Sequence, residues 1–379
     1  MNELYWSAYT SARTAYRAFD DAGAFVGNVA REENLMWWGY DFDDPSNLLD
    51  SRYQIDPDWN TDLTYEALIS LEREIMTDFS AAAYFTYRRY TNWWRTARYA
   101  YESGGVLLDE EHYAVVGQVP QTFEGEDPSG DPATIDTKDA GGRDWYAWAD
   151  GVKNVYDRYV TTWPTSAYDQ YLGIDFVFNK RLSNKWMFQG SFTYQDQKTY
   201  FADAKISNPT NNWAEDGTVY AYNIGGASGK LSQPVFSRWL IKAQGLYQLP
   251  YDFNVSFSFN AREGHLIDYY IEMNDADWAN PYSNSTEVRL EEFGTSRLPT
   301  FWNLNLRLEK VLRAGDMGRI YIMIDAFNVF NNNVMNRRRD YDYGTYYADD
   351  QSHSPYSRSG EPNEVLNPRV FRLGVRFQF

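Results

Sequence analysis

Apolar and polar residues alternate along many segments of the chain, and the last segment shows the alternation most clearly. In RVFRLGVRFQF at 369–379, Phe371, Leu373, Val375, Phe377 and Phe379 alternate with Arg372, Gly374, Arg376 and Gln378. Successive side chains of a strand point to opposite faces, so this pattern predicts a β-strand with one apolar and one polar face. Chain ends usually fray into water, whereas a strand that closes a barrel in lipid needs an apolar outer face and a paired backbone.

The same alternation occurs in four pairs of segments, each joined by a short turn. In one of them Trp302, Leu304, Leu306 and Leu308 alternate with polar residues from Asn303 to Glu309. The predicted turns lie at 76–78, 182–184, 249–252 and 315–318, where Asp, Asn, Gly and Pro favour tight turns. Together with a weakly patterned segment at 4–13 and the closing strand at 368–379, these pairs give ten predicted strands.

Long polar segments separate the hairpins, at roughly 13–62, 93–168, 198–235, 265–297 and 332–367. Soluble domains seldom contain such long loops, whereas outer-membrane barrels alternate short periplasmic turns with long extracellular loops. The pattern predicts an all-β fold, an antiparallel transmembrane β-barrel with that arrangement. An even number of strands places both predicted ends of the barrel segment on the short-turn, periplasmic side.

Charged residues on the polar faces of these strands have no place in lipid. Charged side chains on a lipid-facing position destabilise a barrel near the bilayer midplane. We therefore expect the polar face to line the lumen or to contact what fills it, with the candidate lumen-facing residues Glu66, Glu72, Lys242, Arg307 and Glu309.

Composition agrees with a barrel but also with a soluble β-protein. Aromatic residues make up 18% of the 379 residues, while the mean hydropathy is −0.63. Barrels combine a wet lumen with aromatic girdles, and soluble glycan-binding β-proteins are also rich in Tyr and Trp. The net charge of −18 argues against a nucleic-acid partner. There is no long apolar run typical of a membrane helix, and the N-terminal sequence has no signal-peptide pattern.

The chain gives little support for a cofactor or for catalysis. It has no Cys and three widely spaced His residues, so neither a thiolate nor a His-based metal site is expected. No Ser-His-Asp order, HExxH motif or phosphate-binding Gly loop occurs. His265, just past a predicted strand, is the only candidate for a barrel enzyme, and no Ser pattern accompanies it. We expect no enzyme activity and no cofactor.

Three loop features have both a binding and a structural interpretation. Asp41, Asp43 and Asp44 could hold Ca²⁺, but their spacing fits no EF-hand, and a solvated acidic loop is the better interpretation. Arg337, Arg338 and Arg339, next to Asp340 and Asp342, predict an ion network between loops rather than an anion site. Four tryptophans could stack on a ligand, or could belong to the aromatic girdle or pack the loops together: Trp93, Trp94, Trp145 and Trp148.

Two C-terminal motifs and the sequences of the hairpins resemble those of a known family. Arg372, Gly374, Phe377 and Phe379 form a polar-x-Gly-x-x-aromatic-x-aromatic pattern, and IDAFNVFN lies at 324–331 before an Asn-rich acidic loop. With hairpins such as GIDFVFNKRLSNKWMFQGSFTY, the chain resembles the C-terminal half of a TonB-dependent outer-membrane receptor, with the Oar-like group as the nearest likeness. In that family the terminal pattern is the signal read by the barrel-assembly machinery.

The resemblance implies a role in transport in the outer membrane of a Gram-negative bacterium. A receptor of this family has a 22-stranded barrel with a plug inside it, so 1–379 would be a single C-terminal barrel portion without the plug. The expected partners are outer-membrane lipid, the barrel-assembly machinery, the TonB complex acting through a plug encoded before Met1, and an unknown nutrient ligand. The alternatives are an autonomous small porin-like barrel and a secreted soluble glycan-binding β-protein.

Overall fold

The computed structural model describes most of the chain in seventeen stretches separated by gaps. These are 17–19, 25–28, 39–40, 48–49, 53–100, 106–126, 131–149, 157–163, 166–201, 208–217, 222–224, 233–274, 285–315, 318–338, 341–347, 351–354 and 361–379. The predicted strand at 4–13 and the candidate Ca²⁺ ligands Asp41, Asp43 and Asp44 lie outside them. The chain divides into two compact units, described separately below.

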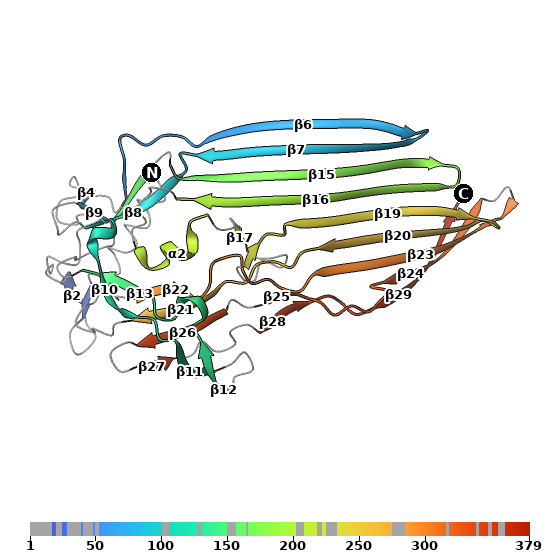
Figure 1. The fold of residues 1–379 in the computed structure, drawn as a ribbon. Helices are drawn as coiled ribbons and strands as arrows, with labels where there is room; N and C mark the ends of the chain where they lie inside the picture. Colours follow the sequence, from blue (N-terminus) through green and yellow to red (C-terminus); the bar gives the residue numbers. More distant parts are fainter. Residues whose placement is uncertain are drawn as a thin grey trace. The chain divides into compact units, whose positions relative to one another are not determined.

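The larger unit, which comprises Asp62–Trp93, Asp109–Ala149 and Trp163–Phe379, contains one sheet of nine antiparallel strands. All nine correspond to strands that the alternation predicts. In spatial order they are β29 (Val370–Gln378), β24 (Arg319–Phe327), β23 (Phe301–Arg313), β20 (Phe253–Arg262), β19 (Trp239–Leu249), β16 (Trp186–Tyr200), β15 (Tyr168–Ser183), β7 (Phe79–Thr91) and β6 (Leu63–Met76), as Figure 1 shows.

Each strand of this sheet pairs with its neighbour in sequence among the nine, so the sheet is a meander. Within the described residues β6 and β29 each pair on one side only, and the sheet is not closed into a barrel. An open sheet is the arrangement expected for part of a larger barrel, and it differs from a tidy closed ten-stranded barrel.

Short turns join β6 to β7, β15 to β16, β19 to β20 and β23 to β24, as predicted. The structure shifts one of them, because β15 continues to Ser183 and pairs it with Trp186. Asn184 and Lys185 then form a two-residue loop with φ of 50° and 71°. Positive φ at both central residues defines the type I′ turn, whose twist matches that of the flanking strands. Asn tolerates this conformation, which explains why the turn begins there.

The long connections are not the structureless loops that the sequence predicted. They contain short strands and helical turns, and we call these elements together the connection layer. The layer comprises η1 (Glu110–His112), β10 (Tyr113–Gln118), β11 (Thr122–Glu126), β12 (Pro132–Asp136), η2 (Lys138–Ala140), β13 (Asp144–Trp148), η3 (Pro209–Asn211), α2 (Asn212–Glu215), β21 (Tyr269–Asn274), β22 (Ser285–Arg289), β26 (Tyr341–Tyr347) and β27 (Ser352–Ser354).

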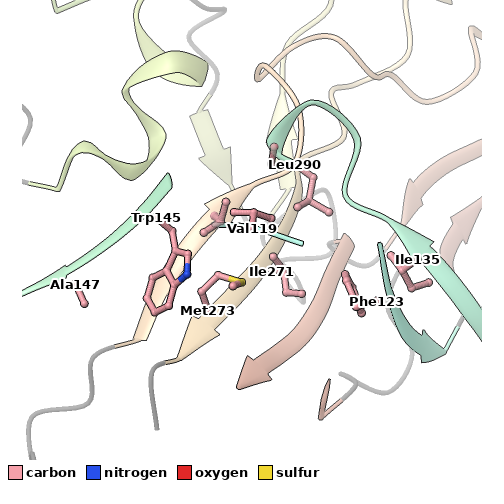
Figure 2. Close-up of a cluster of buried hydrophobic side chains, with 10 residues drawn as sticks. Val119, Phe123, Ile135, Trp145, Ala147, Ile271, Met273 and Leu290 are labelled. Carbon is pink, nitrogen blue, oxygen red and sulfur yellow. The ribbon is translucent and has the colours of Figure 1, made fainter. Parts of the chain in front are cut away.

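Four different connections contribute to this layer and share one core. β21 pairs in parallel with β26, across some seventy residues of sequence (Tyr269↔Tyr341). The amides of Asp139 and Ala140 donate to the carbonyl of Leu290 at 2.9 and 3.2 Å. The buried apolar side chains of the core are shown in Figure 2 and include Val119, Phe123, Ile135, Trp145, Ala147, Ile271, Met273, Val288 and Leu290.

Two short pairs complete the larger unit: β17 (Tyr222–Ile224) with β18 (Gln233–Val235), and β25 (Met335–Arg338) with β28 (Pro362–Val365). The smaller unit comprises Met1–Thr61, Trp94–Leu108 and Asp150–Thr162. Its described strands are β1 (Arg17–Phe19), β2 (Phe25–Asn28), β3 (Gly39–Tyr40), β4 (Leu48–Leu49), β5 (Tyr53–Ile55), β8 (Trp94–Ala100), β9 (Val106–Leu107) and β14 (Asp157–Thr162). No helix in the described stretches is long and apolar enough to cross a membrane.

Candidate functional site

The hydrogen-bond register of the nine-stranded sheet places one kind of side chain on each face. Residues that are partners across neighbouring strands point to the same face. Two rows of partners together cross all nine strands on the apolar face: Leu71, Ala83, Phe176, Phe192, Ile241, Ala261 and Trp302, and then Gly245, Phe257, Leu306, Ala326 and Phe371.

Many side chains of the apolar face are exposed. Leu71 is 72% exposed, Leu306 37%, Ile324 44% and Leu373 79%. On β20 the apolar positions run from Phe253 to Ala261, roughly 27 Å along the strand at the rise of an antiparallel strand. Monomeric soluble proteins rarely expose a continuous apolar surface of this extent, which marks contact with lipid or another protein.

Aromatic and basic side chains mark the hairpin-turn end of this apolar face. The rings of Phe79 and Trp186 lie 6.3 Å apart, and the ammonium of Lys180 lies 5.0 Å from the Trp186 ring. Lys180 is 2% exposed and donates a hydrogen bond to the carbonyl of Arg181 at 2.8 Å. Lys310 lies 4.6 Å from the ring of Phe253. Long basic side chains that cover rings while their charge reaches polar groups are typical of a membrane interface.

The opposite face is polar, and the predicted lumen-facing residues all lie on it. One row of partners reads Glu72, Ala82, Val177, Ser191, Lys242, Asn260 and Asn303. Glu66 pairs with Arg88, Arg307 binds Asp325, and Glu309 accepts a hydrogen bond from Asn254 at 2.9 Å. The structure places these side chains on one face; that this face lines a lumen stays a prediction.

Asp325 connects three strands on the polar face. It lies on β24, is 4% exposed, and is bound by Arg307 of β23 and by Arg372 of β29 at 2.7 Å. The sequence analysis did not select Asp325, although it begins the DAFNVFN motif. Its two arginine partners fix the closing strand against its neighbour, so Arg372 has a role in the folded sheet. Its predicted role in the barrel-assembly signal is a separate matter and stays a prediction.

The rest of the terminal pattern lies on a strand with an open edge. Gly374 faces Met323, and the rings of Phe377 and Phe379 lie 5.8 Å apart. Phe379 is 99% exposed. Phe377 and Phe379 are accessible on the apolar side of the sheet edge, whereas Gly374 lies on the polar side.

Two asparagines of the NVFN segment form hydrogen bonds with both ends of the connection between β24 and β29. Asn328, with φ of 48°, donates from its side chain to the carbonyls of Asn332 and Asn367, both at 2.8 Å. The side chain of Asn331 accepts a hydrogen bond from the amide of Arg369 at 2.9 Å. The two asparagines therefore hold the end of β24 next to the start of β29, which gives this motif a structural reason.

The four candidate ligand tryptophans have different surroundings. Trp145 is completely buried in the core of the connection layer, so it packs the connections together, and a ligand role for Trp145 has no support in this conformation. Trp93 is half-buried and lies 5.1 Å from the ring of Trp163. Trp148 is half-buried, and Trp94, which belongs to the smaller unit, is 58% exposed. For these three, ligand contact stays a prediction.

A charged cluster that the sequence analysis missed lies just beyond β20. Glu263 is 8% exposed and binds Arg238 at 2.7 Å and Arg297 at 3.1 Å. Burial raises the pKa of Glu263, but hydrogen bonds from Arg238 and the charge of Arg297 outweigh it and leave that pKa below its ordinary value. Arg297 also donates to the carbonyls of Phe236 and Gly264. The cluster joins the connection before β19 to the connection after β20.

His265, the sequence's only enzyme candidate, belongs to this region. Burial lowers the pKa of His265 to about 4, with a further contribution from the charge of Arg262. Its Nδ1 is buried without a hydrogen-bond partner. The adjacent backbone is held by the amide of Leu298, which donates to the His265 carbonyl at 2.8 Å. The imidazole is therefore neutral at pH 7 and placed as a packing residue. Within the described stretches no group of three His, Cys, Asp or Glu residues could hold a metal ion.

The predicted arginine network is partly described. Arg337 is 1% exposed and lies 3.8 Å from Glu364 of β28, as an ion pair between segments of the last connection. Arg339 and Asp340 lie outside the described residues.

Comparison with known proteins gives structural likeness only. No protein-family model matches the chain, and no curated protein matches it in sequence. Solved structures similar to it are outer-membrane receptors and iron transporters. The pyoverdine receptor FpvA of Pseudomonas aeruginosa is 11% identical with a TM-score of 0.40, and 87% of this chain matches 32% of that one.

Two further structures show the same level of likeness. The FrpB iron transporter of Neisseria meningitidis is 8% identical with a TM-score of 0.37, over 85% of this chain and 32% of that one. The ferric-catecholate import receptor Fiu of E. coli is 10% identical with a TM-score of 0.40, over 86% and 29%. The chain thus spans about a third of the length of these proteins. TM-scores below 0.5 support no inference about ligand or activity.

Proposed function

We propose that this chain forms the C-terminal part of the barrel wall of a TonB-dependent outer-membrane receptor of the Oar-like group. In this proposal the connection layer faces the outside of the cell and takes part in capturing a nutrient ligand. A plug domain receives energy from the TonB complex, and the apolar face of the sheet contacts lipid. The observation that carries the proposal is the continuous, exposed apolar face across nine antiparallel strands, opposite an equally continuous polar face.

The alternatives have less support. A secreted soluble protein would leave this apolar face in water, which is costly at about 25 cal/mol per Å². An autonomous ten-stranded porin would close on itself, and the described sheet is open. The terminal pattern and the NVFN segment are the sequence features that support the receptor family.

Cysteine labelling tests the orientation of the wall, because the chain contains no Cys. Ser258→Cys and Phe257→Cys are neighbours on β20 whose side chains point to the polar and the apolar face. In outer-membrane vesicles we expect a water-soluble maleimide to label the first and a lipid-soluble maleimide to label the second. The reverse pattern would contradict the proposed wall. For energised transport, uptake of the nutrient ligand by cells that carry the complete receptor should cease when TonB is removed.

A further inference from the structure

The polar face of the nine-stranded sheet is acidic towards the β6 edge. On β6, β7 and β15, strand parity places on this face the acids Glu66, Glu72, Glu74, Asp169 and Asp175, against the bases Arg88 and Arg181. We call these three strands the acidic half. The next strand, β16, is described throughout and carries no charged residue on this face, so it separates the acidic half from the other strands.

The same face is basic towards the β29 edge. On β19, β20, β23, β24 and β29, strand parity places on it the acids Glu309 and Asp325, against the bases Lys242, Arg262, Arg307, Arg313, Arg319, Arg372 and Arg376. We call these five strands the basic half. The polar face therefore changes the sign of its charge from one edge of the sheet to the other (Figure 1).

Ion pairs within the acidic half leave most of its carboxylates without a cation. Glu66 binds Arg88, whereas Asp175 accepts a hydrogen bond from the neutral hydroxyl of Thr193 at 2.5 Å. Across the described part of the chain, four carboxylates of this half take part in no ion pair: Glu72, Glu74, Asp169 and Asp175. Arg181, at the hairpin-turn end of β15, is an unpaired base among them.

The basic half has the opposite excess. Asp325 binds Arg307 and Arg372, and Arg313 is paired at 3.0 Å with Asp252 of a hairpin turn. Four bases of this half take part in no ion pair within the described residues: Lys242, Arg262, Arg319 and Arg376. The uncompensated charges thus have opposite signs in the two halves, and a partner on this face contacts both.

We propose that the polar face receives a plug domain whose surface is basic opposite the acidic half and acidic opposite the basic half. The inference rests on the proposed function, which places a plug against this face. Complementary potentials fix orientation and partner choice more than affinity. Turning the plug by half a revolution would bring like charges together, so the two halves fix the rotational orientation of the plug inside the wall.

Two serines of the polar face allow its charge to be measured in the full chain, refolded in detergent. Ser70 is exposed on β6, two residues before Glu72, and Ser258 is half-buried on β20, in the basic half. Ser70→Cys should react faster with a cationic methanethiosulfonate, and Ser258→Cys with an anionic one. We expect the ratio of the two rates to differ by about 10-fold or more between the positions, and less in high salt. Equal ratios would overturn the inference.

The same serines test the plug in cells that carry the complete receptor. The readout is uptake of vancomycin, a large antibiotic that an occupied barrel excludes. Ser70→Lys and Ser258→Glu place like charges against the proposed plug surface and should raise uptake by about 5-fold or more. Ser70→Glu and Ser258→Lys are the matched controls at the same positions and should leave uptake near that of the unchanged receptor.

Two outcomes of the uptake experiment would overturn the inference: equal uptake in all four variants, or an increase that follows the position and not the sign of the charge. The maleimide labelling of Ser258→Cys and Phe257→Cys separates this failure from failure of the proposed function. If that labelling is as expected and the crossed pattern of uptake is absent, the wall stands and the plug surface is wrong. If the labelling is reversed, the wall assignment itself is wrong.

Discussion

The nine-stranded sheet and the connection layer place their apolar side chains in opposite environments. In the sheet Leu71 and Leu373 are more than 70% exposed, whereas in the layer Trp145 and Ile271 are completely buried. The layer follows the rule of a water-soluble domain, in which apolar groups leave water. The sheet has its apolar groups outside and its ion pairs on the other face, which is the arrangement that lipid favours. In the proposed function, one chain therefore combines a region suited to water with a region suited to lipid.

The largest expected effect concerns the buried side of this comparison. Trp145→Ala removes a completely buried indole from the layer core and should destabilise the layer by about 3 to 5 kcal/mol. Limited proteolysis should then cut the layer while the hairpins of the sheet stay protected. Phe371→Ala, at an exposed position of the sheet, is the control. If the Trp145→Ala and Phe371→Ala variants resist proteolysis equally, the proposed difference between the layer core and the exposed apolar face is wrong.

A charge placed on the exposed apolar face should have the next largest effect. Leu306→Arg introduces a cation on the proposed lipid side and should destabilise the folded barrel wall by about 2 to 4 kcal/mol. Ser256→Arg, on the polar face beside Arg307, is the matched control and should have a much smaller effect. Urea titration of the protein in lipid vesicles measures both. A larger loss of stability for Ser256→Arg than for Leu306→Arg would show that the lipid-facing and polar faces are assigned the wrong way round.

The connections near Glu263 should lose stability in acid. The pKa of His265 falls from 6.5 to about 4 on folding, so the unfolded chain binds the proton first as the pH drops. Stability is then full above about pH 6.5 and decreases towards pH 4, by an amount on the order of 2 kcal/mol. Glu263 contributes in the same direction at lower pH, because its pKa is depressed in the folded state.

Hydrogen exchange of the amides of Ile267 and Leu298 between pH 7 and pH 4 measures this loss. The His265→Gln variant, which cannot take up the proton, should lose less protection over the upper part of that range. An unchanged pH dependence in His265→Gln would show that the imidazole does not cause the effect.

The smallest effect is expected on the polar face. The Glu66–Arg88 pair has side chains that are 42% and 40% exposed, so Glu66→Gln should cost about 0.2 to 1 kcal/mol. Urea titration, with Arg88→Gln as the companion variant, checks it. A cost of several kcal/mol would show that the Glu66–Arg88 pair is shielded from water in the folded protein.

The sequence predicted the sheet much better than the layer, for a physical reason. In the strands of the sheet the alternation extends over nine or more residues, and each hairpin partner follows within a few residues. β11 has five residues, and β26 finds its parallel partner β21 some seventy residues earlier. A short strand with a distant partner has no local signature, so the layer was interpreted as polar loops.

The site residues divide in the same way. The alternation placed Glu66, Lys242 and Arg307 on the polar face, because strand parity alone decides this. The ion pairs of Asp325 with Arg307 and Arg372 depend on which strands are neighbours. The Glu263 cluster depends on where a connection returns to the sheet. Periodicity carries neither kind of information. For Trp145 the sequence left ligand contact, the aromatic girdle and loop packing open, because its burial depends on the layer core.

The shared core of the connection layer has a consequence for the order of folding. Each hairpin of the sheet consists of contacts between residues close in sequence, so it can form as soon as its own two strands are present. The layer needs β10 to β13, β21, β22 and β26 together, and the last of these ends at Tyr347. Non-local pairings form slowly because the intervening chain must first be ordered. We therefore expect the hairpins to form first and the core of the connection layer to assemble later, when its last strand is in place.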